Sequence, residues 1–193
     1  MSMPEIPNFI KVTKENIGAF VSKNDVEILK KANKNFTPYH TSGDGNCLFN
    51  AVSLALYGNE SNAAVLKKIT AKYFAENYAE LREEYEEMSL YFLDNYETLQ
   101  SCLIDGHYSN PLTITAIANA LGISIQLIYP PLNSNDVGKE ILNTRIQPIE
   151  YAHVPKIISI MFTTCNKWVE GTAFVPNHYV ALLLNREGNF SFF

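Results

Sequence analysis

The sequence TSGDGNCLFNAVSLALYG, residues Thr41–Gly58, joins a turn-rich loop directly to a strongly apolar segment. Within Leu48–Leu56 only Asn50 and Ser53 are polar. This pattern predicts a helix with one narrow polar stripe that is buried around most of its girth. Gly58 is suited to the left-handed turn that ends many helices. We therefore expect the rest of the fold to be built around this helix.

A cysteine, Cys47, lies where the loop meets this helix. Backbone N–H groups without helical partners gather at a helix N-terminus, and the positive end of the helix dipole lies there too. Both effects favour the thiolate over the thiol, so Cys47 is a candidate nucleophile. A cysteine nucleophile needs a base that takes its proton, and usually a third group that orients the base.

Composition narrows the range of functions. The chain has 193 residues, which fits one domain of ordinary size. Its formal charge of −5 argues against a nucleic-acid binder held by phosphate contacts. Its three cysteines lack the spacing of a disulfide framework or a zinc site, which suits a reducing compartment. With no stretch of membrane-spanning or signal-peptide character, we expect a cytoplasmic protein without a metal, nucleic-acid or membrane partner.

Hydrophobic spacing divides the chain into a helical first part and a strand-rich second part. Helical patterns cover residues 13–21, 26–29, 60–78, 80–102 and 113–121, and strand patterns cover 123–129, 145–149, 157–162 and 178–184, with a final pairing segment at 190–193. Residues 32–40 are predicted to be a loop, because Pro38 disfavours helix at the residue before it. Helices followed by strands, without regular alternation, predict an α+β fold.

An acidic run is the main charge feature of the chain. Seven acidic residues and one basic residue lie between positions 80 and 97. A solvated helix face explains such a run, and an acidic surface that receives a basic partner is the alternative.

Candidate bases are limited to the four histidines, which are His40, His107, His153 and His178. His178 opens an apolar strand directly after Pro176-Asn177, so a sheet would hold its backbone while the ring stays at the rim. The other three lie in predicted loops, although His40 is close enough in sequence to lie near the site. A histidine that only packs in the core is the alternative for His178, but the prepared cysteine favours the catalytic interpretation.

The cysteine loop and the late histidine together resemble a known family. The residues that carry the resemblance are Asp44-Gly45-Asn46-Cys47-Leu48-Phe49, Ile104-Asp105-Gly106-His107-Tyr108 and Asn177-His178-Tyr179. They resemble the ovarian tumour (OTU) family of cysteine deubiquitinases over residues 38–185. The resemblance implies a papain-like α+β fold, with N-terminal helices packed on a C-terminal mixed or antiparallel sheet. We divide the chain into a helical segment, 1–37, and a catalytic domain, 38–193, within one compact unit.

Membership of this family would imply a reaction and a partner. The reaction is hydrolysis of isopeptide bonds at the ubiquitin C-terminus, by thiolate attack and an acyl-enzyme intermediate. The partner is ubiquitin or a polyubiquitin chain, no cofactor is implied, and we expect a monomer. A protease for a ubiquitin-like modifier and a pseudoenzyme that binds ubiquitin without cleaving it are the alternatives. A secreted microbial or viral effector with this domain would act in the host cytosol.

The resemblance also assigns roles to single residues. It makes Cys47 the nucleophile and His178 the general base and then the acid. Backbone N–H groups of the loop, including those of Gly45 and Asn46, would hold the oxyanion, and glycine permits the dihedrals that turn amides inward.

The third member of the site is where this chain departs from the family pattern. Many members carry an acidic or amide residue two positions after the histidine, because residues i and i+2 share a strand face. Here that position is Val180, which can orient nothing. Asp44 is the candidate substitute, although as a helix N-cap it would accept from the Cys47 N–H instead. Asn177 or an upstream polar residue within 33–46 remains the other possibility.

Overall fold

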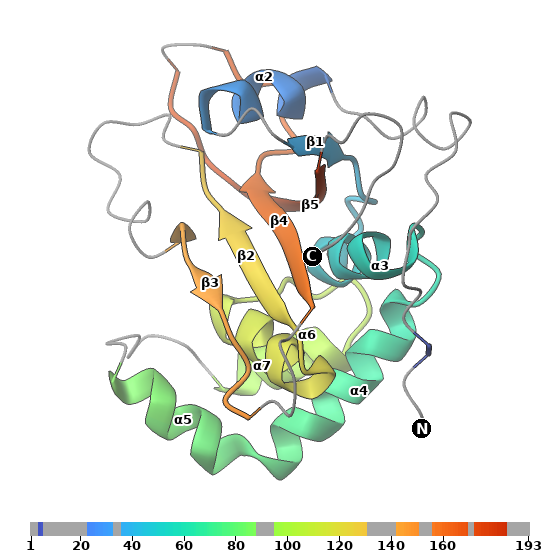
Figure 1. Cartoon of the computed structure of the whole chain (residues 1–193), viewed down its shortest axis with the longest axis vertical. Helices are drawn as coiled ribbons and strands as arrows, with labels where there is room; N and C mark the ends of the chain where they lie inside the picture. The colour runs from blue at the N-terminus through green and yellow to red at the C-terminus, as the bar shows by residue number, and fades with distance from the viewer. Residues whose placement is uncertain are drawn as a thin grey trace.

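A five-stranded mixed sheet crosses the molecule, with its strands in the order β1-β5-β4-β2-β3 (Figure 1). This computed structural model describes residues 4–5, 23–32, 36–87, 95–130, 142–150, 156–169 and 172–184. The strands are β1 (Phe36–Tyr39), β2 (Ser124–Ile128), β3 (Arg145–Ile146), β4 (Ile157–Thr163) and β5 (His178–Leu184). Strands β2 and β4 run parallel, and the other three pairs are antiparallel. The predicted α+β class is confirmed.

Helices cover the sheet. They are α2 (Lys23–Ala32), α3 (Cys47–Tyr57), α4 (Ala63–Glu76), α5 (Tyr78–Glu87), α6 (Asn95–Leu103) and α7 (Pro111–Leu121). In Figure 1, α4 to α7 lie together at the lower end, whereas α2 lies at the upper end near β1. Within the acidic run, residues 80–87 fall on α5 and Glu97 falls on α6, and α5 packs against α4. The helix predicted at 13–21 and the pairing segment predicted at 190–193 lie outside the described residues.

The helix predicted to form the centre of the core, α3, does so. Every residue of Cys47–Leu56 is buried, and the helix packs against β5, β4 and α4. Gly58 ends it in the left-handed conformation at φ 77°, with its N–H donating to the Leu54 carbonyl. The polar stripe binds the flanking loops, since the Ser53 hydroxyl donates to the Asn59 carbonyl at 2.7 Å. Burial of each large aliphatic side chain here stabilises the fold by about 1.5–3 kcal/mol.

The prediction of a loop at 32–40 was wrong over Phe36–Tyr39, which forms β1. This strand pairs antiparallel with β5, and Tyr39 lies opposite Ala181. Pro38 has no N–H for a ladder, and proline is tolerated because β1 is an edge strand with β5 as its sheet neighbour. The boundary drawn between residues 37 and 38 falls inside this strand.

Helix α7 shows both of the end signals that the sequence carries. Asn110 caps it by accepting from the Thr113 N–H at 3.0 Å, and Gly122 follows it in the left-handed conformation. The helix begins at Pro111, two residues before the predicted start, because proline is favoured in the first position of a helix. Strand β2 follows directly and carries the chain into the sheet.

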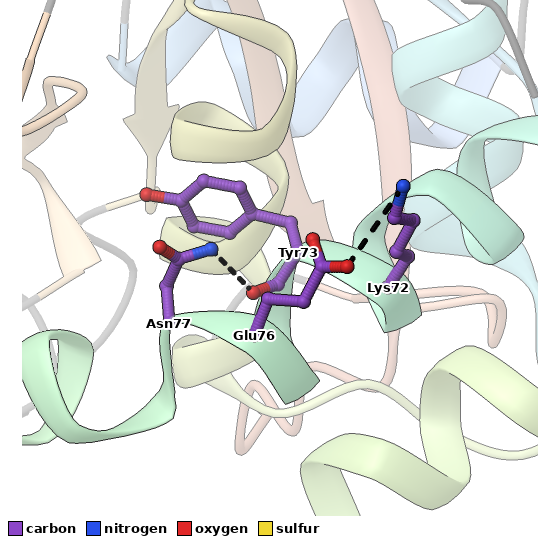
Figure 2. A network of polar contacts seen from close by, with 4 residues as sticks. All are labelled: Lys72, Tyr73, Glu76 and Asn77. Atoms are coloured by element: carbon purple, nitrogen blue, oxygen red, sulfur yellow. Dashed lines mark hydrogen bonds and ion pairs between the residues drawn. The ribbon is translucent and has the colours of Figure 1, made fainter.

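Figure 2 shows the end of α4, where Asn77 joins it to α5. Both the backbone N–H and the side-chain amide of Asn77 donate to the Tyr73 carbonyl, each at 2.9 Å. Beside it, Lys72 and Glu76 form an ion pair of 3.8 Å whose side chains are 70% and 61% exposed. Such an exposed pair contributes little to stability. The two Asn77 bonds therefore contribute more to holding the end of this helix.

Candidate active site

The loop between β1 and α3 is held at four points. The Thr41 hydroxyl donates to the Tyr179 carbonyl. Ser42 donates from its N–H and its hydroxyl to the Glu60 carboxylate, at 2.8 and 2.6 Å. Asp44 and Asn46 make the remaining contacts, described below. This loop is therefore a fixed part of the fold that leads into Cys47.

Cys47 is the first residue of α3, as predicted, and is 3% exposed. Burial raises the pKa of its thiol above the ordinary value, and the negative charge of Asp44 raises it further. Hydrogen bonds with the backbone of Tyr179 and Leu48 act in the opposite direction, because they stabilise the thiolate. Tyr179 is the residue that follows His178 in β5.

His178 is the first residue of β5 and is 2% exposed. Its Nε2 lies 3.2 Å from the Thr41 Oγ1, and its ring centroid lies 5.6 Å from that of His40. Burial lowers the pKa of His178 to about 4, and the charge of His40 lowers it as well. The Thr41 backbone and the charge of Asp44 partly oppose this shift in the pKa of His178.

The structure thus brings the predicted nucleophile and base to the same place. Helix α3 packs on β5, and the backbone of Tyr179, the residue after His178, affects the pKa of the Cys47 thiol. Among the described residues, no hydrogen bond joins the Cys47 sulfur to the His178 imidazole. Both groups respond to the charge of Asp44, and both neighbour the Tyr179 backbone.

Asp44 does not cap α3, and this part of the prediction was wrong. The N-cap residue is Asn46, whose side chain makes no capping bond. Asp44 Oδ1 instead accepts from the Asn46 N–H at 2.9 Å and from the Asn50 side-chain amide at 3.2 Å. An aspartate readily bonds its own backbone two residues on, and this local turn competes with capping. Neither bond reaches His178, so Asp44 organises the loop.

Asn46 joins the cysteine loop to a distant segment. Its amide nitrogen donates to Asp105 Oδ1 at 2.9 Å, and its Oδ1 accepts from the Gly106 N–H at 3.1 Å. The same Oδ1 accepts from the ammonium group of Lys67 at 2.6 Å. Lys67 also donates to the Ile104 carbonyl at 2.8 Å. Helix α4 and segment 104–106 therefore fix the loop from two sides.

Lysine side chains are normally exposed, but that of Lys67 in α4 is only 7% exposed. Burial lowers the pKa of its ammonium group, whereas the charges of Asp105, Cys102 and Asp44 raise it. Its Nζ lies 5.6 Å from the centre of the Phe49 ring. The lysine is retained in the interior because its hydrogen bonds satisfy the charge.

Gly45 is required by both its dihedral angle and its surroundings. Its φ is 84°, and a Cβ built on it would lie 2.0 Å from the Gly106 carbonyl oxygen. No side chain fits there without moving the backbone of segment 104–106. The glycine thus allows the two loops to pack directly against each other.

Sequence patterns did not mark Lys67 as a residue of this site, because nothing local distinguishes it from a surface lysine. Thr41 lies within residues 33–46, which were left open for the third member, and Asp105 lies in a segment that carries the resemblance. Asn177, a candidate third residue, accepts from the Cys165 N–H at 3.0 Å with its side-chain oxygen, and this is a bond to a residue other than His178. In the described part of the chain, no group of three histidine, cysteine or acidic residues is arranged to hold a metal ion. No described helix is long and apolar enough to cross a membrane.

The comparison with known families decides the identity of the fold. The family model described as the OTU domain of Vertnin matches residues 38–90 and 64–163. The chain belongs to the OTU family. The match includes the cysteine loop, α3 and segment 104–106, and it ends at the last residue of β4.

Curated relatives and solved structures agree with this OTU assignment. The deubiquitinating protein VCPIP1 of human and mouse is 35% identical over 80 residues, which is 39% of this chain but only 6% and 7% of those proteins. The solved OTU domain of OTUD1 has a TM-score of 0.50 at 21% identity, covering 88% of this chain and 99% of that one. The viral OTU protease of Taggert virus has a TM-score of 0.52 at 13% identity, covering 82% and 86%. The predicted papain-like OTU fold is confirmed.

Proposed function

We propose that this OTU domain is a cysteine-type deubiquitinase that hydrolyses isopeptide bonds at the ubiquitin C-terminus. One placement carries the proposal: Cys47 is the buried first residue of α3, His178 is the buried first residue of β5, and α3 packs on β5. Membership of the OTU family and the partial similarity to the deubiquitinating protein VCPIP1 support it.

The proposed reaction runs through a thioester. His178 accepts the Cys47 thiol proton, and the thiolate attacks the isopeptide carbonyl carbon to give a tetrahedral oxyanion. As this intermediate collapses, His178 returns the proton to the leaving lysine amine. His178 then takes a proton from water, which attacks the thioester and releases the ubiquitin carboxylate and the Cys47 thiol.

Backbone amides of the cysteine loop would stabilise the oxyanion. The Asn46 N–H already donates to Asp44, so we assign this role to the N–H groups of Cys47 and Gly45. The first N–H groups of α3 have no partner within the helix, and the helix dipole adds positive potential. Asn46 then serves through its side chain, which holds the loop in this conformation.

Two groups of exposed apolar side chains, one next to the segment that binds Asn46 and one in the segment before His178, would receive the ubiquitin tail. Leu103 and Tyr108 are 64% and 58% exposed, on either side of the residues that bind Asn46. Val169 and Val175 are 54% and 68% exposed, in the segment that leads to His178. Exposed apolar side chains gathered beside a reactive group are typical of a binding surface.

A pseudoenzyme that binds ubiquitin without cleaving it is the second candidate. Among the described residues, the thiol and the imidazole are not hydrogen-bonded, and Val180 replaces the family's usual orienting residue. A protease for a ubiquitin-like modifier would use the same chemistry as the first candidate and differ in its choice of partner.

Covalent capture separates these functions. Wild-type protein would be incubated with ubiquitin carrying a C-terminal electrophile, and with matching probes made from ubiquitin-like modifiers. A deubiquitinase forms an adduct with the ubiquitin probe that Cys47→Ala abolishes and His178→Ala impairs. The matched control is Cys165→Ala, because Cys165 is an exposed free thiol outside the site. Binding without an adduct would favour the pseudoenzyme, and a panel of di-ubiquitins would then define linkage preference for an active protein.

A further inference from the structure

The hydroxyl group of Thr41 lies between the imidazole of His178 and the Tyr179 carbonyl. Thr41 is fully buried. Its Oγ1 lies 3.2 Å from His178 Nε2 and makes a hydrogen bond with the Tyr179 oxygen. A carbonyl oxygen can only accept, so the single hydroxyl proton is directed to Tyr179. The hydroxyl therefore presents a lone pair to the ring, and the ring nitrogen that faces it must carry a proton.

The register of the sheet explains why Thr41 lies there. Tyr39 of β1 lies opposite Ala181 of β5, and the two strands are antiparallel. If the same register continues for two residues, Thr41 lies opposite Tyr179. The chain leaving β1 thus passes beside the first residues of β5. Thr41 can therefore supply the polar atom for His178 that Val180 does not.

We propose that Thr41 is the positioning residue of this site, which holds His178 with a proton on Nε2 and leaves Nδ1 as the base for Cys47. The inference deepens the proposed function and rests on it for its catalytic meaning. The Cys47 thiol proton moves to Nδ1, the Nε2 proton continues to donate to Thr41, and Nδ1 later delivers its proton to the leaving amine. The alternative orienting groups are engaged elsewhere, Asp44 by Asn46 and Asn50, and Asn177 by Cys165.

A hydroxyl orients the ring in a different way from a carboxylate. It fixes the tautomer and the ring plane, but it brings no negative charge to stabilise an imidazolium. The lowered pKa of His178 agrees with such surroundings, since burial and His40 outweigh the contributions that favour the charged ring. The thiol and imidazole then rest in their neutral forms until substrate binds.

The tautomer can be read without any reaction. Long-range ¹H–¹⁵N correlation spectra of the ¹⁵N-labelled full chain at neutral pH distinguish a ring protonated on Nε2 from one protonated on Nδ1. The spectrum of His178→Gln identifies the signals of His178. We expect the Nε2–H form in the wild type and in Thr41→Ser, and a loss of that preference in Thr41→Val. An Nδ1–H form in the wild type would overturn the proposal, whether or not Thr41→Val folds.

Kinetics provide the second readout. With a ubiquitin C-terminal amide substrate, Thr41→Val should lower kcat roughly 10²-fold while KM stays within about two-fold, because a misdirected base affects the chemical step. Thr41→Ser should retain kcat within about three-fold, because it keeps the hydroxyl. A Thr41→Val protein with wild-type kcat would also overturn the proposal. A wild type with the Nε2–H ring that neither cleaves nor captures ubiquitin would instead refute the proposed function and leave the ring geometry standing.

Discussion

The ammonium group of Lys67 donates to the side-chain oxygen of Asn46 across 2.6 Å, so a buried charge on α4 supports the loop that carries the nucleophile. The same Asn46 oxygen also accepts from Gly106. Removing the lysine therefore takes a donor from two acceptors, the Asn46 side-chain oxygen and the Ile104 carbonyl.

Lys67→Met keeps most of the side-chain volume but removes the charge and both hydrogen bonds. We expect a loss of about 1–3 kcal/mol in the free energy of unfolding, because buried acceptors lose their partner. We also expect kcat to fall by roughly 10-fold or more, because the loop is no longer fixed. Denaturant unfolding and steady-state kinetics measure the two effects. Lys68→Met, on the exposed face of the same helix, is the control and should change stability by less than about 0.5 kcal/mol.

Gly45→Ala should disrupt the contact between the two loops. A left-handed residue with a side chain costs roughly 1–2 kcal/mol, and the new Cβ would also overlap the Gly106 carbonyl. We expect the melting temperature and kcat to fall together. Gly43→Ala is the matched control, because a Cβ at Gly43 meets no atom within 4 Å. Equal melting temperatures for the two variants would contradict the loop packing described above.

The buried histidine predicts how stability depends on pH. The pKa of His178 is about 4 in the folded protein, below its ordinary value of 6.5. The unfolded chain therefore binds the extra proton first, and stability falls as the pH drops from about 6.5 to about 4, by at most ~3 kcal/mol. The titratable groups around the ring are His40 and Asp44 from the loop after β1 and Cys47 from α3.

Urea unfolding across this pH range measures the effect. His178→Gln should remove most of the slope between pH 6.5 and 4. His40→Gln should make the slope shallower, because the pKa of His178 rises when the neighbouring positive charge is removed. If the free energy of unfolding depends on pH equally in His178→Gln and in the wild type, other groups cause this pH dependence.

The exposed valines before β5 predict an effect on substrate binding alone. Val169→Asp and Val175→Asp should raise KM for a ubiquitin substrate roughly 10-fold while leaving kcat within about two-fold, because each places a charge on an apolar contact. Tyr96→Ser is the control, since Tyr96 is equally exposed but lies at the opposite end of α6 from Leu103. Unchanged KM values in both valine variants would remove this segment from the proposed binding surface.

Sequence patterns predicted the helices and strands that are specified by local signals within their own residues. Helix α3 was predicted because its apolar run and its terminal Gly58 are local signals, and β5 because HYVALLL is apolar along its length. Strand β1 was missed because Phe36–Tyr39 is short and contains Pro38, and its pairing depends on β5, far along the chain.

The site was predictable to the same extent. Cys47 and His178 were chosen from a motif and a strand start, the structure places them as the first residues of α3 and β5, and their catalytic roles stay a prediction. Lys67 carries no such signal, because a lysine is normally exposed and its partners Asn46 and Ile104 are visible only after folding. The position of Thr41 follows from strand register, which sequence spacing alone does not reveal.

The pairing of β1 with β5 also sets the shortest fragment worth expressing. A fragment that starts just before the cysteine motif would retain the nucleophile, the base and α3, and would still lose β1. Its β5 would become an open edge made almost wholly of apolar residues, which invites pairing between molecules. Such a fragment should aggregate, and its inactivity would reflect that exposed edge and not the chemistry of Cys47.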